Sequence, residues 1–280
     1  MVSTEEQRRA KPVMPLLRWA GSKRQLLPRL LPLWDRAQAV RYIEPFVGSA
    51  ALFFAASPES AILSDRNGEL IRMYRTIRKD PDGVAATMAQ FRRDKRTYLR
   101  LRREDPTQME QKYRAARFLF LNRHCFNGLY RTNLLGEFNV PYAPAKAGEP
   151  PDLGHIRAAA ERLRRARLFS GDFESVIKSV VAPGDFVYMD PPYAVANRRI
   201  FRQYSATTFG FEDLHRLSAL LYAIDRLGAY FVLSYAICTE SLRAFEHWGH
   251  IRVTTQRNIA GFAAHRRRSA ELVVTNIPFE

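Results

Sequence analysis

The residues Asp190, Pro191, Pro192 and Tyr193 bring a carboxylate, a proline carbonyl and an aromatic ring together within four positions. They follow the apolar run 186–189, which predicts a short buried strand. The two prolines exclude both a helix and a continued strand ladder, so the chain must leave the sheet there as a rigid extended turn. Open α/β sheets bind their ligands at this carboxyl end of the strands.

This combination of groups suits the methylation of an amino group that is conjugated to an aromatic ring. Such a nitrogen is a poor nucleophile, because its lone pair is delocalised into the ring. A carboxylate and a carbonyl that accept its two N–H bonds localise the lone pair and stabilise the positive charge that develops during attack. A stacked tyrosine aligns the ring with the methyl donor. The alternative is a strand-ending turn in which the aspartate is a cap and the tyrosine belongs to the core.

The charge composition indicates a polyanionic partner. The 280 residues include 44 Lys+Arg and 28 Asp+Glu, which gives a net charge of +16. Nucleic acid is the first candidate and an anionic membrane surface the second, with a basic solubilising surface as the alternative. No apolar run approaches the roughly 20 residues of a membrane span, and the charged N-terminus has no signal-peptide core, so we expect no membrane segment.

The cysteines and histidines predict neither a disulfide nor a metal site. Cys125 and Cys238 are far apart and have no Cys-x-x-Cys partner, as expected of reduced thiols in a cytosolic protein. His247 and His250 form a close pair with no third ligand type nearby, so we predict no metal.

Two strand–turn–helix patterns precede residue 70. In one, a strand ending at Glu44 leads through Phe46 to a small-residue turn at Gly48 and an apolar helix, as in nucleotide sites. The next strand, 60–64, closes on Asp65, an acidic residue roughly 20 positions on that suits ribose hydroxyls. Only Gly48 is a glycine in this turn, which argues against a dinucleotide fingerprint. An earlier turn places Ser22 as the cap of a helix from Lys23 to about Leu33, where the lysine can neutralise a carboxylate.

The middle of the chain is helical and basic, and it ends in a segment without helical character. Helical patterning covers 70–101 and 110–122. The segment 122–142 interleaves arginine, asparagine and aromatic residues on turns, and its part 135–142 predicts a short hairpin. Base-edge reading with stacking requires these residue types, although a loop with structural asparagines is an equal alternative.

The second half resumes the alternation of helices and strands. A strand at 166–170 ends at Asp172 and Phe173, where a carboxylate and an aromatic ring can face an adenine. The polar, basic loop 194–208 is expected to cover bound DNA. Near the end, a basic loop between two strands predicts phosphate contacts through Arg266, Arg267 and Arg268, against the alternative of a solvated turn.

Taken together, these motifs resemble the Dam-like (D12 class) DNA adenine-N6 methyltransferases. The resemblance covers nearly the whole chain from residue 16 in the family's order. It is carried by the segments 17–23, 44–48, 63–67, 127–131, 136–141 and 190–193.

The resemblance implies an α/β, Rossmann-like fold that uses S-adenosylmethionine, with a seven-stranded mixed sheet and helices on both faces. A mainly helical target-recognition domain carrying a β-hairpin is expected at 72–155. The catalytic domain is expected at 14–71 and 156–280, after a disordered N-terminus at 1–13. The implied partner is double-stranded DNA, methylated after base flipping in GATC or a related site. We expect a cytoplasmic, nucleoid-associated protein that works as a monomer without a metal.

The resemblance also assigns roles to single residues. The catalytic residues are Asp190, Pro191 and Tyr193. The cofactor-binding residues are Trp19, Lys23, Glu44, Phe46, Gly48, Asp65, Asp172, Phe173 and Asp190. The DNA-binding residues are Arg18, Phe126, Asn127, Leu129, Arg131, Pro141 and the basic loop Arg266, Arg267 and Arg268.

Five positions depart from the family pattern. Arg18 stands where lysine often reads the first guanine, although arginine also pairs bidentately with that base. Ala50 replaces a glycine of the cofactor turn. Tyr235 stands where asparagine is usual in the wall of the adenine pocket, and Tyr130 and Ala145 differ in the recognition segment. Rival activities are methylation of RNA or of a protein amide, and DNA binding without catalysis.

Overall fold

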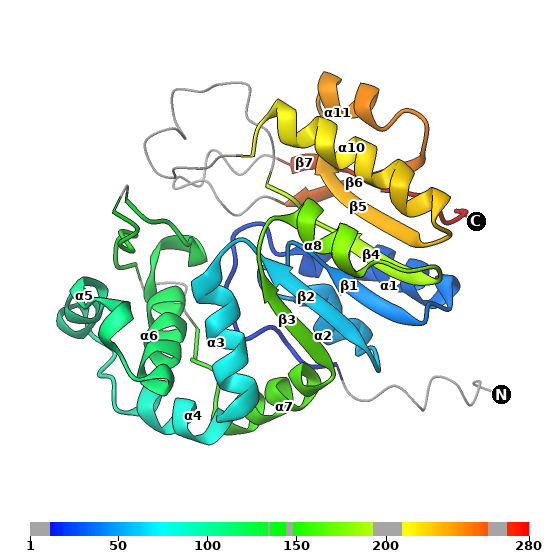
Figure 1. The fold of residues 1–280 in the computed structure, drawn as a ribbon. Helices are drawn as coiled ribbons and strands as arrows, with labels where there is room; N and C mark the ends of the chain where they lie inside the picture. Colours follow the sequence, from blue (N-terminus) through cyan, green and yellow to red (C-terminus); the bar gives the residue numbers. More distant parts are fainter. Residues whose placement is uncertain (1–11, 134, 144–147, 193–208, 257–267, 280) are drawn as a thin grey trace.

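A seven-stranded sheet is the centre of the fold, with the strand order β3-β2-β1-β4-β5-β7-β6 (Figure 1). The computed structural model describes residues 12–133, 135–143, 148–192, 209–256 and 268–279, without the side chains of 255, 256, 268 and 269. The strands are β1 (Arg41–Glu44), β2 (Ala61–Asp65), β3 (Ala166–Ser170), β4 (Asp185–Met189), β5 (Tyr230–Ala236), β6 (Gly249–Gln256) and β7 (Arg268–Thr275).

Strands β1 to β5 are parallel, and β7 runs antiparallel between β5 and β6. The predicted mixed sheet of seven strands is therefore confirmed. The chain moves outward from β1 to β2 and β3, and then crosses back to β4 on the other side of β1. The strand order reverses between β1 and β4. Doubly wound sheets bind ligands in the crevice that such a reversal forms at the carboxyl ends of the strands.

The sheet separates two hydrophobic cores, because successive strand residues point to opposite faces. Tyr42 and Phe186 belong to one core, and their neighbours Ile43 and Val187 belong to the other. Helices supply the other wall of each core, so the expected helices on both faces are confirmed. The first core is covered by α1 (Leu27–Ala37), α2 (Ala51–Ala56), α3 (Gly68–Lys79) and α7 (Leu153–Arg164), and the second by α8 (Phe173–Val180), α10 (Phe211–Arg226) and α11 (Thr239–Ala244).

The first core continues past the β3 edge into further helices. These are α4 (Pro81–Ala89), α5 (Lys95–Arg103) and α6 (Gln111–His124), which lie on the β3 side of the sheet in Figure 1. Short 3-10 turns occur at Lys23–Leu26, Pro106–Gln108 and Phe126–Gly128. None of the helices in the described ranges is both long and apolar enough to cross a membrane.

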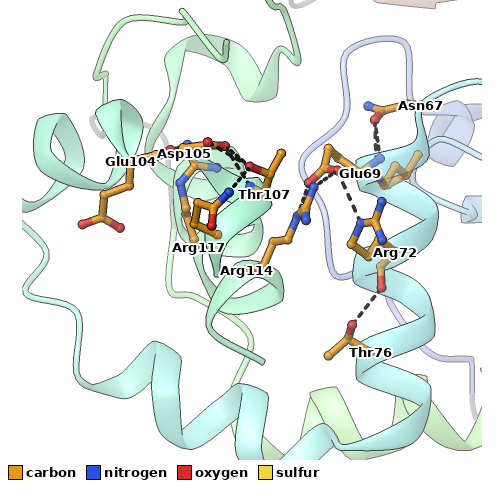
Figure 2. A network of polar contacts seen from close by, with 11 residues as sticks. Asn67, Glu69, Arg72, Thr76, Glu104, Asp105, Thr107, Arg114 and Arg117 are labelled. Atoms are coloured by element: carbon orange, nitrogen blue, oxygen red, sulfur yellow. Dashed lines mark hydrogen bonds and ion pairs between the residues drawn. The ribbon is translucent and has the colours of Figure 1, made fainter. Parts of the chain in front are cut away.

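Two arginines of α6 fix its position relative to its neighbours (Figure 2). Arg114 donates from Nε to Glu69 Oε2 (2.7 Å) and from Nη2 to Glu69 Oε1 (2.5 Å), which joins α6 to the first turn of α3. Arg117 is buried and donates to the carbonyls of Leu101, Arg102 and Glu104, at the C-terminal end of α5. A buried guanidinium therefore satisfies carbonyls that the end of a helix leaves unpaired.

After α6 the chain forms a narrow antiparallel loop. Single bridges pair Cys125 with Tyr142 and Thr132 with Phe138. The Asn133 side chain closes the tip, because its Oδ1 accepts from the backbone of Leu135 and Glu137. Hairpin-like pairing is thus present in the predicted segment, although it forms isolated bridges instead of a ladder.

Some expectations about local structure need revision or fall elsewhere. Ser22 precedes the 3-10 turn, but its side chain makes no capping hydrogen bond, so that prediction is wrong. Its hydroxyl instead accepts from Ser49 Oγ at 3.1 Å. The boundaries expected at 71/72 and 155/156 fall inside α3 and α7, and the division into domains stays a prediction. Residues 1–11 of the expected disordered N-terminus lie outside the described residues, whereas Val13 packs on the core.

We predict that Arg114→Ala lowers the free energy of unfolding by about 2 kcal/mol, because it leaves a largely buried carboxylate without its bidentate partner. Urea denaturation measures this change. The matched control is Arg93→Ala, whose partner Glu149 is 84% exposed. That variant should lose about 0.5 kcal/mol or less. Equal losses in the two variants would contradict the structural role of the Arg114 pair.

Candidate functional site

Three carboxylates stand side by side at the carboxyl edge of the sheet. Asp65 ends β2, Glu44 ends β1, and Asp190 follows β4, and these strands are adjacent in the order β2-β1-β4. Glu44 is buried, and the other two are only partly exposed. Their negative charge at the crevice favours a ligand that carries positive charge and hydrogen-bond donors.

Asp190 is paired with a lysine from the N-terminal segment. Lys23 Nζ lies 2.8 Å from Asp190 Oδ1 and 3.7 Å from Glu271 Oε2, and it donates to the carbonyl of Gly21 at 3.0 Å. Burial raises the pKa of Asp190 to about 6, against the lowering effect of Lys23. Sequence reasoning foresaw that Lys23 can neutralise a carboxylate, and the structure identifies the carboxylate as Asp190.

Glu271 was not predicted from the sequence. It lies within the apolar strand β7, is 5% exposed, and is the second carboxylate near Lys23. The signal that could have revealed it is an acidic residue directly before the apolar run Leu272–Val274. Charged residues are rarely buried without a partner.

The Glu44 carboxyl is hydrogen-bonded to another side chain of β1. Tyr42 Oη donates to Glu44 Oε2 at 2.9 Å. Burial raises the pKa of Glu44 well above its usual value, and the nearby charges of Asp190 and Asp65 raise it further. Glu44 therefore retains its proton more readily than an exposed carboxyl, which limits the repulsion among the three acids.

Asp65 anchors the turn that follows β1. Its Oδ2 accepts from Gly48 N at 3.1 Å and its Oδ1 from Asn67 N at 2.9 Å, while burial raises its pKa. Each carboxylate oxygen can accept more than one bond, so a ligand hydroxyl can still be received. Tyr74 of α3 also holds this turn, because its Oη donates to the carbonyl of Gly48 at 2.9 Å.

Gly48 also permits the approach of Trp19. A Cβ at this position would lie 2.8 Å from Trp19 Nε1, and φ is +43°, so a side chain is excluded both by space and by conformation. Ala50 adopts φ +55° in the same turn, a conformation that costs L residues about 1–2 kcal/mol. The departure from glycine at Ala50 therefore leaves backbone strain beside the crevice.

The other end of the crevice is aromatic. The ring of Phe46, after β1, lies 5.1 Å from that of Phe173 and 6.2 Å from that of Phe209. Asp172 caps α8 by accepting from Glu174 N at 3.1 Å. The structure thus brings the predicted residues Phe46, Asp172 and Phe173 together, and adds Phe209. No sequence signal marked Phe209, because only the fold brings the residues before α10 next to Phe46 and the start of α8.

The predicted DNA-contacting residues gather around the end of α6. The Asn122 side chain accepts from Arg18 N at 3.0 Å and donates to Arg18 O at 2.7 Å, which fixes the N-terminal segment against α6. A Cβ on Gly128 would lie 2.5 Å from Arg18 O, so the turn there requires glycine. Arg18 Nη1 donates to the carbonyl of Arg123 at 2.9 Å.

Five further predicted DNA-contacting residues lie in the turn and loop that follow α6. Asn127 adopts φ +53° in the tight turn. Phe126 N donates to Pro141 O at 2.9 Å, and Leu129 N donates to Phe126 O at 3.2 Å. Arg131 Nε donates to Asn139 Oδ1 at 2.7 Å, across the loop.

Tyr130 joins this loop to Trp19, which lies against the turn at Gly48. Its ring stacks at 6.2 Å on Trp19 and at 5.3 Å on Phe118. Burial raises its pKa to about 12, the charge of Glu69 adds to this shift, and a hydrogen bond with Asn67 lowers it. Tyr130, which departs from the pattern of the resembled family, is therefore an uncharged side chain packed between Trp19 and Phe118.

Tyr235, the other aromatic departure, is buried in β5. It packs edge-to-face against Phe245, with ring centroids 5.7 Å apart. Several predicted positions lie outside the described residues, namely Tyr193, Ala145, the loop 194–208, Arg266 and Arg267, and the side chain of Arg268. The described residues hold no group of three or more His, Cys, Asp or Glu side chains able to bind a metal.

The family model and the relatives that match this chain all describe DNA methyltransferases or carry methyltransferase names. Residues 19–259 match the model of the D12 class N6 adenine-specific DNA methyltransferases. The chain is 33% identical over 271 residues to Type II methyltransferase M1.LlaDCHI of Lactococcus lactis subsp. cremoris, covering 94% of this chain and 95% of that one. It is 35% identical over 218 residues to the DNA adenine methylase of Serratia marcescens, covering 75% and 78%. It is 29% identical over 287 residues to Type II methyltransferase M.MjaIII of Methanocaldococcus jannaschii, covering 94% and 99%.

We predict that Lys23→Met raises the pKa of Asp190 above about 6, because the variant removes the charge and the hydrogen bond that oppose the effect of burial. A larger share of Asp190 is then protonated at pH 7. Carbon-13 NMR titration of labelled aspartate, assigned by comparison with Asp190→Asn, measures the shift. Lys178→Met, which removes an exposed partner of Glu174, is the control and should leave Asp190 unchanged. A pKa that stays at 6 or falls in Lys23→Met contradicts the pairing.

Proposed function

The chain belongs to the D12 class N6 adenine-specific DNA methyltransferases, and we propose that it transfers the methyl group of S-adenosylmethionine to N6 of an adenine flipped out of duplex DNA. The observation that carries this proposal is the row of three carboxylates, Asp65, Glu44 and Asp190, at the β1/β4 crevice. A methyl donor and an adenine amino group both offer positive charge or N–H donors to such a row.

The described residues fit S-adenosylmethionine. Its ribose offers hydroxyl donors to Asp65, and its ammonium and sulfonium charges suit the acidic crevice near Asp190. Its adenine matches the aromatic end of the crevice, where Phe46 and Phe173 provide faces and Asp172 provides an acceptor. When bound, this group supplies an electrophilic methyl carbon.

The chain's own residues then prepare the target nitrogen. Asp190 and the carbonyl of Pro191 accept the two N–H bonds of N6, which localises the lone pair and stabilises the developing positive charge. Tyr193 stacks on the adenine and fixes its orientation. As the N6–carbon bond forms, the sulfonium–methyl bond would break and S-adenosylhomocysteine would be left. Asp190 need not be a strong base, because the positively charged methylated nitrogen loses its extra proton readily to water.

Recognition of DNA is proposed for the loop and turns around the end of α6. Arg18 and Arg131 are placed to pair with bases, together with Asn127, Leu129 and Pro141, and Phe126 is proposed to fill the space of the extruded adenine. The basic residues Arg266, Arg267 and Arg268 are proposed to contact phosphates. A site such as GATC is the first candidate target, read by the helical part of the chain.

The function is tested with purified protein, S-adenosylmethionine labelled in the methyl group, and equal amounts of duplex DNA, RNA and peptide. We predict transfer to adenine N6 of DNA alone. Asp190→Ala should reduce turnover at least about a hundredfold, because the variant loses stabilisation of transition-state charge, while DNA affinity stays within about twofold. Near-normal turnover in the variant would overturn the role of Asp190, and labelling of RNA or peptide would identify a rival activity.

We predict different effects for the two groups of arginines. Arg131→Ala should relax sequence preference, because a base contact contributes about 1–3 kcal/mol of discrimination. Arg267→Ala should weaken binding to all sequences alike and reduce the salt slope by about one unit. Methylation-sensitive sequencing of random DNA and binding at several salt concentrations separate the two results. Uniform loss across sequences in Arg131→Ala would exclude base reading by that residue.

A further inference from the structure

Arg216 of α10 binds three carboxylates that come from two separate parts of the chain. Its Nη2 donates to Asp172 Oδ1 at 2.5 Å, its Nε to Glu174 Oε2 at 2.7 Å, and its Nη1 to Asp213 Oδ1 at 2.8 Å. The guanidinium also lies over the Phe173 ring, 4.8 Å from the centroid. One side chain therefore joins α10 to the end of β3 and the start of α8.

These contacts restrict Asp172 to one orientation. Its Oδ1 accepts from Arg216 and from the backbone of Glu174 and Ser175. Within the described part of the chain all these bonds reach Oδ1, which leaves Oδ2 as the oxygen that can accept from a ligand. A carboxylate whose orientation is fixed by several donors selects a ligand N–H group more strongly than a carboxylate that rotates freely.

Arg216 is connected to both Phe173 and Phe209. Its guanidinium lies over the Phe173 ring, and its partner Asp213 binds the backbone of Gly210, the residue after Phe209. Asp213 Oδ2 accepts from Gly210 N at 2.9 Å while its Oδ1 binds Arg216. The two rings, whose centroids are 6.1 Å apart, are therefore connected through the cation–π contact of Arg216 and its charged hydrogen bonds to Asp213 and on to Gly210.

We propose that Arg216 is a positioning residue that holds Asp172 and the Phe173–Phe209 pair so that the crevice selects a purine with an exocyclic amino group. The proposal rests on the proposed function, because the purine is the adenine of S-adenosylmethionine. Arg216 does not contact the reacting atoms. Its effect is on cofactor selectivity.

Electrostatics explains why this position needs an arginine. Without it, Asp172, Glu174 and Asp213 are three neighbouring carboxylates, and among the described residues only Glu174 keeps a cationic partner, Lys178. Mutual repulsion would turn Asp172 away and release Gly210. Lysine restores the charge but not the planar fork that serves three acceptors at once.

Calorimetry without DNA tests the proposal with two probes, S-adenosylhomocysteine and S-inosylhomocysteine, in which a carbonyl replaces the amino group. The wild type should prefer the adenosyl probe by at least about tenfold, because a charged acceptor discriminates strongly between a donor and an acceptor. Arg216→Ala should reduce that preference about five- to tenfold, mainly by weakening the adenosyl probe. Arg216→Lys should recover part of it.

The matched control is Arg78→Ala, which removes an arginine that donates to the carbonyl of Ala166 at the opposite end of β3. Its preference should equal that of the wild type. An unchanged preference in Arg216→Ala, or equal weakening of both probes, overturns the inference and indicates a purely structural arginine. A wild type that binds both probes equally also overturns it but leaves the cofactor assignment intact. A wild type that binds neither probe overturns the proposed cofactor itself.

Discussion

The ion pair between Lys23 and Asp190 is the constraint around which the rest of the crevice is arranged. Burial removes Asp190 from water, and the buried acids Glu44 and Glu271 lie nearby. Desolvation and repulsion by like charges both disfavour the charged form of Asp190. Lys23 favours the charged form, yet it is shared with Glu271, so the pKa of Asp190 stays at about 6 and the ionised form prevails at neutral pH. A carboxylate in that state can accept hydrogen bonds at neutral pH without holding a ligand's proton tightly.

That pair depends on where the N-terminal segment lies. Lys23 reaches Asp190 because Arg18 is bound through its backbone to Asn122 of α6, and because Trp19 rests on Gly48. The segment therefore touches both the helical part and the sheet.

A second connection runs from the sheet to the helical part through α3. Asn67 follows the carboxylate Asp65 and caps α3, and Glu69 in the first turn binds Arg114 of α6. Tyr130 stacks on Trp19 and on Phe118 of α6. The elements proposed to read DNA are thus joined by direct contacts to the carboxyl ends of β1 and β2, where the cofactor is proposed to bind.

The sequence by itself determined the strands, the turns at Gly48 and Asp190, and the family, because each depends on local chemistry such as apolar runs, prolines and small residues. The partners of charged groups were decided only by the tertiary structure. Phe209 gave no sequence signal, and Glu271 stood out only as an acidic residue before an apolar run. Ser22 was assigned a cap it does not form, since its hydroxyl accepts from Ser49 instead. Arg216 likewise meets its acids only after the sheet assembles. Pairing of distant residues follows from strand order, and strand order is a property of the whole chain.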